Sequence, residues 1–92
     1  MKKILIQELR DFLMENYNQD GYYPFINFLD FHYDYGKYTL MALCVDEDTD
    51  KLKAECVGYS GFGLYYLDLE KLSYKTIKAM KDKIELNLCM EV

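Results

Sequence analysis

Apolar residues recur at helical spacing near both ends of the chain. In residues 4–17 they fall three or four positions apart, at Leu5, Leu9, Phe12 and Leu13. The same spacing returns near the C-terminus, at Ile77, Met80, Ile84 and Leu88. Ser73 stands just before that second segment, where its hydroxyl can accept a hydrogen bond from a backbone N–H of the first turn. The pattern therefore predicts two amphipathic helices, one near each end.

Between these helices the pattern changes to the period of two that is typical of β-strands. Four such segments follow one another: residues 22–35, 38–45, 52–59 and 64–69. Short polar or glycine-containing links separate them, with Gly36 and Lys37 as the first turn. Since short links join antiparallel neighbours, the sequence predicts an α+β fold, a four-stranded antiparallel meander in α-β-β-β-β-α order. Residues 1–92 are expected to form one domain, with the N- and C-terminal helices packed on the sheet.

The second and third strand segments differ in how their faces are patterned. In the third, Leu52, Ala54 and Cys56 are expected to point inward and Lys53 and Glu55 outward. The second is apolar on both faces, and strict alternation gives two rows: Leu40, Ala42, Cys44 and Met41, Leu43, Val45. Helices on a single side of the sheet would leave one row in water, where an apolar patch usually marks a contact. We therefore predict that Met41, Leu43 and Val45 form an interface, most simply with a second copy of the chain.

The segment Gly58-Tyr59-Ser60-Gly61-Phe62-Gly63 separates the third and fourth strand segments. A serine nucleophile turn needs glycine two positions after the serine and a helix beyond it, but Phe62 and a strand pattern follow here. The glycine spacing also differs from the Gly-x-Gly-x-x-Gly of dinucleotide-binding turns. Ser60 and Gly61 suit a tight bend. The segment is therefore interpreted as a turn between strands, with no catalytic or phosphate-binding role.

The distribution of acidic residues along the chain indicates which kind of partner it can bind. The net charge is −5, and residues 20–70 hold ten acidic against three basic residues. Four of these acids crowd the predicted turn between the second and third strands: Asp46, Glu47, Asp48 and Asp50. Such a surface repels phosphate backbones, so direct binding to nucleic acid is not expected. It favours a protein partner with a basic surface, such as a nucleic-acid-handling enzyme, which the chain would regulate or inhibit.

A second acidic group surrounds the single histidine. Asp30, His32 and Asp34 alternate along the first strand segment and so share one face. The two carboxylates are expected to favour the charged imidazole and to hold it in an ion pair. We predict that these three residues also contribute to partner binding.

The sequence indicates neither a calcium site nor a zinc site. Three aspartates of the acidic turn have the 1, 3, 5 spacing of a calcium loop, but Lys51 and Val57 stand where that loop requires glycine and glutamate. The three cysteines and His32 lack the two-residue gaps that are usual between zinc ligands. No metal or other cofactor is therefore expected.

The cysteines, at positions 44, 56 and 89, are predicted to be free thiols. In a symmetric hairpin Cys44 lies opposite Lys53, which leaves it too far from Cys56 for a disulfide. The N-terminal segment lacks the apolar run of a signal peptide, and no stretch is long enough to span a membrane. A cytoplasmic protein without membrane contact is therefore expected.

Three classes of function follow from these observations. The first is a non-enzymatic interaction protein that binds a basic partner, and the second is a homodimeric structural or assembly protein. The third is a small enzyme, but no set of nucleophile, base and orienting group can be assembled from the motifs above. The sequence therefore favours the first class.

Overall fold

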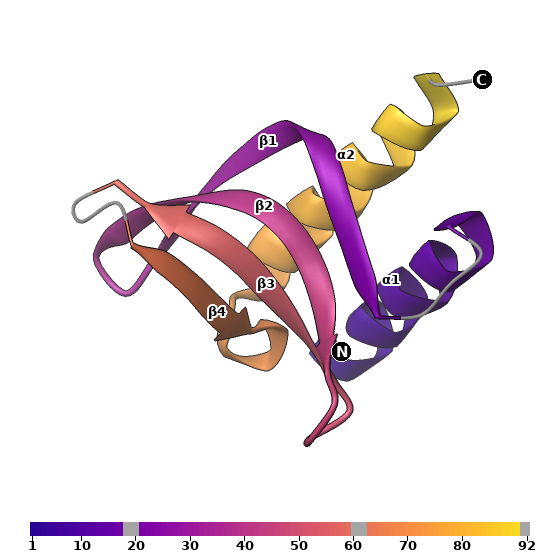
Figure 1. Cartoon of the computed structure of the whole chain (residues 1–92), viewed down its shortest axis with the longest axis horizontal. Coiled ribbons are helices and arrows are strands. Elements are labelled where there is room, and N and C mark those ends of the chain that lie inside the picture. Colours follow the sequence, from indigo (N-terminus) through magenta and orange to yellow (C-terminus); the bar gives the residue numbers. More distant parts are fainter. Residues whose placement is uncertain (18–20, 60–62, 91–92) are drawn as a thin grey trace.

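A computed structural model of the chain describes residues 1–17, 21–59 and 63–90, with the side chains of 25–28 and 87–90 left out. Two helices flank a four-stranded antiparallel sheet in the order β1-β2-β3-β4 (Figure 1), which confirms the predicted α+β meander. The elements are α1 (Lys2–Tyr17), β1 (Tyr22–Tyr33), β2 (Gly36–Asp46), β3 (Lys51–Gly58), β4 (Leu64–Asp68), the 3-10 turn η1 (Leu69–Lys71) and α2 (Tyr74–Met90).

Both helices lie on the same face of the sheet, behind it in the view of Figure 1. One core joins the helices to this inner face, and its members include Leu5, Leu9, Leu13, Ile77, Met80, Ile84, Leu40, Leu43, Leu52, Ala54 and Cys56. Burial of these side chains is the main favourable contribution to folding. As predicted, Ser73 begins α2, and its Oγ accepts a hydrogen bond from the backbone N–H of Thr76 at 3.1 Å.

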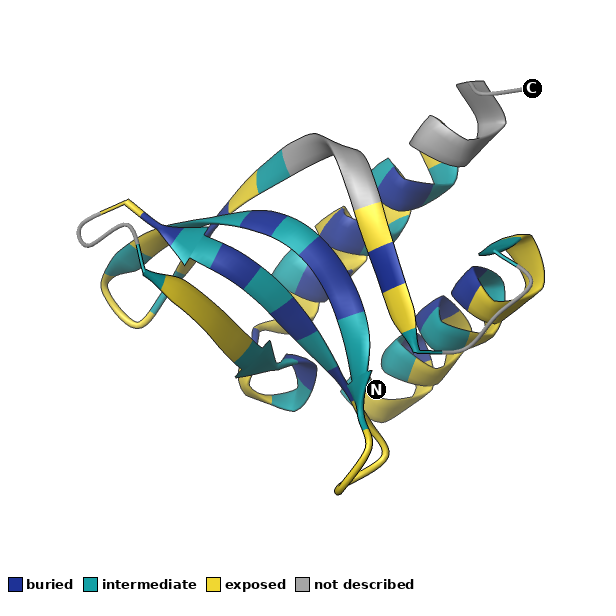
Figure 2. Cartoon of the chain, in the orientation of Figure 1, coloured by how far each residue is buried: buried dark blue, intermediate teal, exposed yellow. Residues whose placement is uncertain are grey.

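The opposite face of the sheet carries neither helix, and we name it the open face. By the strand register its central residues are Tyr22, Ala42, Cys44, Lys53, Glu55, Val57, Leu64 and Tyr66. Figure 2 is drawn from this side and shows buried residues concentrated on β2 and β3, while β4 is largely exposed. The outward direction predicted for Lys53 and Glu55 is confirmed.

An irregularity in β2 changes which of its side chains meet the helices. The pairing of β2 with β3 shifts between Leu40 and Ala42. Met41 is therefore an extra residue, as in a β-bulge, and strict alternation ends at this point. Pairing of β1 with β2 is interrupted at the same level, between Pro24 and Leu29.

The predicted interface row of Met41, Leu43 and Val45 is wrong, because Leu43 pairs with Ala54 and Val45 with Leu52, which both point to the helix side. The bulge at Met41 brings Leu40 to this same side, which strict alternation would not allow. Leu43 is 0% exposed, and Val45 packs against the core. Leu43 is thus covered by the chain's own helices and cannot form an interface with another molecule, and Val45 is partly covered by the core.

The first hairpin turns two residues earlier than predicted. Asp34 and Tyr35 form the turn, with φ values of 47° and 64°. Gly36 already pairs with Tyr33 and belongs to β2. Two successive positive φ values are typical of a type I′ turn, whose twist matches that of antiparallel strands. The prediction followed glycine's preference for positive φ, whereas two non-glycine residues adopt it here.

The glycine-containing segment after β3 connects two antiparallel neighbours, as predicted. The backbone N–H of Gly58 donates to the carbonyl of Gly63 at 3.2 Å, and Val57 pairs with Leu64 just beyond. Ser60 and Gly61 themselves lie outside the described residues. Their part in the turn therefore stays a prediction.

Cys44 pairs with Lys53 across the second hairpin, as the sequence predicts. Cys44 and Cys56 are both free thiols, while the side chain of Cys89 lies outside the described part of the chain. Within the described residues, neither helix is long and apolar enough to cross a membrane.

Candidate functional site

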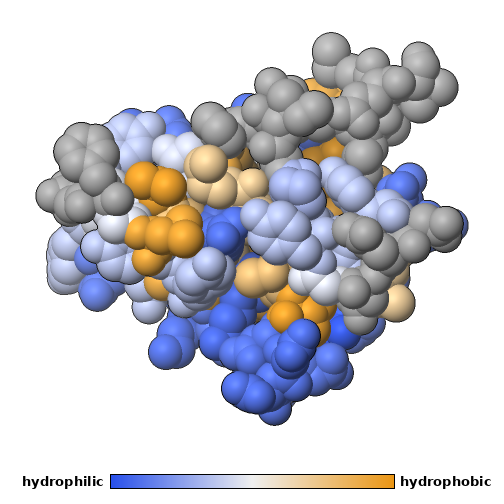
Figure 3. Space-filling view, viewed as in Figure 1, coloured by the Kyte–Doolittle hydropathy of each residue, from blue (hydrophilic) through white to orange (hydrophobic). Residues whose placement is uncertain are grey.

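Side chains from all four strands meet at the centre of the open face. Tyr22 of β1 pairs with Cys44 of β2, and Ala42 of β2 pairs with Glu55 of β3. Glu55 in turn pairs with Tyr66 of β4. Figure 3 views this side and shows hydrophobic and weakly hydrophilic side chains gathered over the strands, with strongly hydrophilic residues at the β2–β3 turn. This centre is our candidate site.

Glu55 holds two tyrosines from opposite edges of the sheet. Its Oε2 accepts a hydrogen bond from the hydroxyl of Tyr22 at 2.8 Å, and its Oε1 accepts one from Tyr66 at 2.9 Å. Both bonds raise the pKa of the phenols, because a neutral hydroxyl can donate to the carboxylate and a phenolate cannot. The two residues are still 50% and 54% exposed. Their orientation is therefore fixed while much of their surface remains available.

A small residue on β2 leaves room for this arrangement. To reach Glu55, the Tyr22 side chain crosses β2 between Cys44 and Ala42, its diagonal neighbour in the register. Ala42 is 0% exposed although it lies outside the core cluster. The tyrosine thus covers the part of β2 that the helices do not.

The apolar surface continues from this centre toward the β3–β4 hairpin. Val57 pairs with Leu64, which is 55% exposed. Beyond them the Lys37 ammonium lies 4.8 Å from the centroid of the Tyr59 ring, a cation–π contact. The open face therefore combines aromatic, aliphatic and charged groups.

Two of the four predicted turn acids form ion pairs within the chain. Asp46 pairs with Lys53 at 2.7 Å, and this contact holds the pKa of Asp46 below its usual value. The Asp50 carboxylate and carbonyl both accept from the guanidinium of Arg10, at 3.0 Å. Glu47 and Asp48 are exposed and, among the described residues, form no ion pair. The charge that the turn offers to a partner is therefore smaller than its composition indicates.

The other predicted acidic group lies at the opposite end of β2. Asp30 accepts a hydrogen bond from the Thr39 hydroxyl at 2.8 Å, and this bond and one from Tyr59 lower its pKa. His32 is exposed and pairs across the ladder with Lys37, while Asp34 lies in the β1–β2 turn. The two predicted groups therefore flank the open face at its ends and do not form one cluster.

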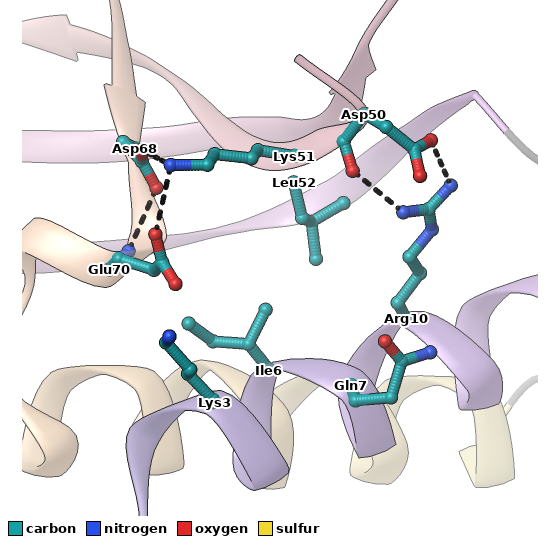
Figure 4. A pocket seen from close by; sticks show the side chains of 9 residues that line it. All are labelled: Lys3, Ile6, Gln7, Arg10, Asp50, Lys51, Leu52, Asp68 and Glu70. Carbon is teal, nitrogen blue, oxygen red and sulfur yellow. Dashed lines mark hydrogen bonds and ion pairs between the residues drawn. The ribbon is translucent and has the colours of Figure 1, made fainter.

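A hollow of about 260 Å³ lies between α1 and one end of the sheet (Figure 4). The Arg10–Asp50 pair closes one side, and Lys51 closes the other through Glu70 at 3.2 Å and Asp68 at 3.8 Å. Ile6 and Leu52 point toward each other between these pairs. These cations and carboxylates neutralise one another. We therefore interpret the ion pairs around the hollow as structural contacts, of which Arg10–Asp50 joins α1 to the β2–β3 turn.

Another hollow, of about 430 Å³, lies between β1 and the start of α2 and includes His32. The serine that lines it, Ser73, is engaged as the helix cap. No cysteine lines it in the described part of the chain, and Ser60, the other nucleophile considered from the sequence, lies outside that part. The described residues also contain no group of three or more potential metal ligands.

Sequence reasoning missed Tyr22, Glu55 and Tyr66 as a group. The alternation of the third strand does place Glu55 on the outer face, and the chain contains ten tyrosines. Their meeting depends on the registers of three strand pairs, which the alternation within one strand does not determine.

No protein-family model, curated protein or solved structure matches the chain.

Proposed function

We propose that this chain is a non-enzymatic protein-interaction domain that binds its partner on the open face. The observation that carries the proposal is the pair of half-exposed tyrosines, Tyr22 and Tyr66, both held by Glu55. Rings that are already ordered lose little conformational freedom on binding, and tyrosine is enriched in protein interfaces. A carboxylate between them adds a polar contact at the centre.

The charge around this face supports a partner with a basic surface. The net charge is −5. Exposed Glu47 and Asp48 lie at one end of the face and Asp34 at the other. Opposite charges across an interface speed association and orient the partners. A nucleic-acid-handling enzyme would fit, because an acidic domain can cover the basic groove with which such an enzyme binds phosphates, and so regulate or inhibit it.

Affinity capture with matched variants tests this proposal. The immobilised chain is expected to retain a partner from a lysate of its own cells. We expect Tyr22→Ala and Glu55→Gln to reduce that retention about tenfold or more, because they remove or release a ring at the centre of the face. Tyr35→Ala is the matched control, since Tyr35 is fully exposed in the β1–β2 turn.

The retained protein is then purified, and its affinity for each variant and its dependence on salt are measured. Affinity should fall as salt rises, because charges at an exposed rim are screened. Cross-linking should place a basic surface of the partner over Glu55. A partner that binds wild type and Tyr22→Ala equally well contradicts the proposal.

A further inference from the structure

β4 is an edge strand whose large apolar side chains are only half-covered. Leu64, Tyr65 and Tyr66 are 55%, 41% and 54% exposed. Leu64 and Tyr66 belong to the open face, while Tyr65 points to the other side, where its ring meets that of Tyr38 at 5.5 Å. Figure 2 shows most of the strand as exposed. Both faces of β4 are therefore partly accessible, and no strand of the described part of the chain pairs with its outer edge.

The backbone of β4 also has groups available for pairing. The N–H of Gly58 donates to the carbonyl of Gly63, and the N–H of Tyr59 donates to the carbonyl of Lys37. Antiparallel pairs alternate between bonded and non-bonded positions. Both bonds indicate that Gly63 and Tyr65 direct their backbone groups toward β3. The N–H and carbonyl groups of Leu64 and Tyr66 therefore point away from β3, toward the free edge.

We propose that β4 of a second copy of this chain adds antiparallel to this edge, so that the sheet continues from one copy into the other. The favoured register places Leu64 opposite Tyr66 of the second copy and Tyr65 opposite its equivalent. Residues opposite each other then point to the same face, and aliphatic and aromatic side chains pair as they do within stable sheets. The two open faces join into one surface.

The lack of charged side chains on β4 and the symmetry of the register both favour a second copy as the occupant. Residues 64–67 contain no charged side chain in a chain of net charge −5, so two acidic copies meet here without like charges in contact. Asp68 lies beyond the paired residues and interacts with Lys51 at 3.8 Å. In the symmetric register, the backbone N–H and carbonyl groups of Leu64 and Tyr66 form hydrogen bonds with the second copy. The edge strand is then no longer unpaired.

The buried area sets the expected strength. The exposed parts of these three side chains amount to roughly 600 Å² over two copies, given the usual size of tyrosine and leucine side chains, and strand addition can bury only part of this area because both faces of the sheet stay open. This area is below that of standard stable interfaces. The dimer should therefore form weakly, at chain concentrations between micromolar and millimolar. The inference rests on the edge of β4, and its tests use the isolated chain and need no foreign partner.

Sedimentation equilibrium over that concentration range tests the inference. Wild type should show a monomer–dimer equilibrium, and Leu64→Lys should weaken it about tenfold or more, because lysine on an edge strand opposes strand addition. Tyr35→Lys introduces the same charge at the exposed β1–β2 turn and should dimerise like wild type. Circular dichroism checks that both variants are folded.

Amide hydrogen exchange in the wild type gives a second readout that needs no substitution. Exchange at Leu64 and Tyr66 should slow as concentration rises, since their N–H groups become bonded in the dimer. A chain that stays monomeric to millimolar concentration overturns the inference. So does a dimer that is unaffected by Leu64→Lys, or one whose Leu64 and Tyr66 amides gain no protection.

Discussion

At the scale of single residues, Glu55 determines the form of the open face. Its two carboxylate oxygens each accept one tyrosine hydroxyl, from β1 and from β4. Loss of Glu55 would release both rings, whereas loss of one tyrosine would leave the other bond in place. The effects of substitutions at these three positions should therefore be non-additive.

Tyrosine titration tests this role of Glu55. In the wild type we expect Tyr22 and Tyr66 to titrate above the ordinary phenol pKa of 10.0, because each donates to the carboxylate. In Glu55→Gln, both pKa values should move back toward 10.0, since the amide carries no charge. NMR of ring-labelled tyrosine measures the change, with Tyr22→Phe and Tyr66→Phe assigning the signals. Unchanged titration in Glu55→Gln would contradict the arrangement.

Thiol reactivity tests the burial of Cys56. Burial raises the pKa of this thiol to about 11, and the thiolate is the reactive form. In the folded protein near pH 8, Cys56 should be alkylated much more slowly than Cys44, which is only half-buried. Site-resolved mass spectrometry gives both rates in one sample, and addition of urea should remove the difference. Equal rates without urea would show that Cys56 is accessible.

At the scale of elements, the sequence patterns predict which segments form helices and strands better than how the strands pair. The Ser73 cap and the Cys44–Lys53 pairing depend on residues close in sequence, and both are confirmed. The bulge at Met41 is different, because it arises from pairing with two neighbouring strands and leaves no periodic signal. A shift of one residue reverses the faces of a strand. The bulge is therefore the reason that Leu40 and Leu43 lie on the same side of β2.

Denaturation of two leucine variants tests the corrected register. Leu43→Ala should lower the free energy of unfolding by about 2–5 kcal/mol, because it leaves a cavity in the core. Leu64→Ala is the matched control at a 55% exposed position, where the loss should stay below about 1 kcal/mol. Urea unfolding followed by circular dichroism measures both. Similar losses would mean that Leu43 is not a core residue.

At the scale of the whole molecule, titrating groups on the sheet set the pH range of stability. Asp30 and Asp46 have lowered pKa values, through hydrogen bonds from Thr39 and Lys53 respectively. Their contribution is present above the ordinary carboxyl pKa of 3.8 and is lost as pH falls through the lower folded-state values. Tyr22 and Tyr66 have raised pKa values, so their contribution is present below pH 10.0 and is lost as pH rises through the folded-state values.

Stability should therefore be lost at both ends of the pH scale for different reasons. Urea midpoints between pH 2 and 11 are expected to fall below about pH 4 and above about pH 10. Asp46→Asn should flatten the acid side and also part of the alkaline side, because Asp46 raises the pKa of Lys53. Tyr66→Phe should flatten the alkaline side alone. If the urea midpoint falls equally above pH 10 in wild type and Tyr66→Phe, then Tyr66 does not contribute to the pH dependence of stability.

Placement of both helices on one side of the sheet has a consequence for how the sequence can change over time. On the helix side, each substitution is limited by volume, because its neighbours are packed in the same chain. On the other side, substitutions are limited by the molecule that binds there. Ala42 is an exception, because the Tyr22 side chain crosses beside it and limits the volume at this position. A complete substitution scan scored first for folding and then for binding should therefore separate into two sets of positions that alternate along β3.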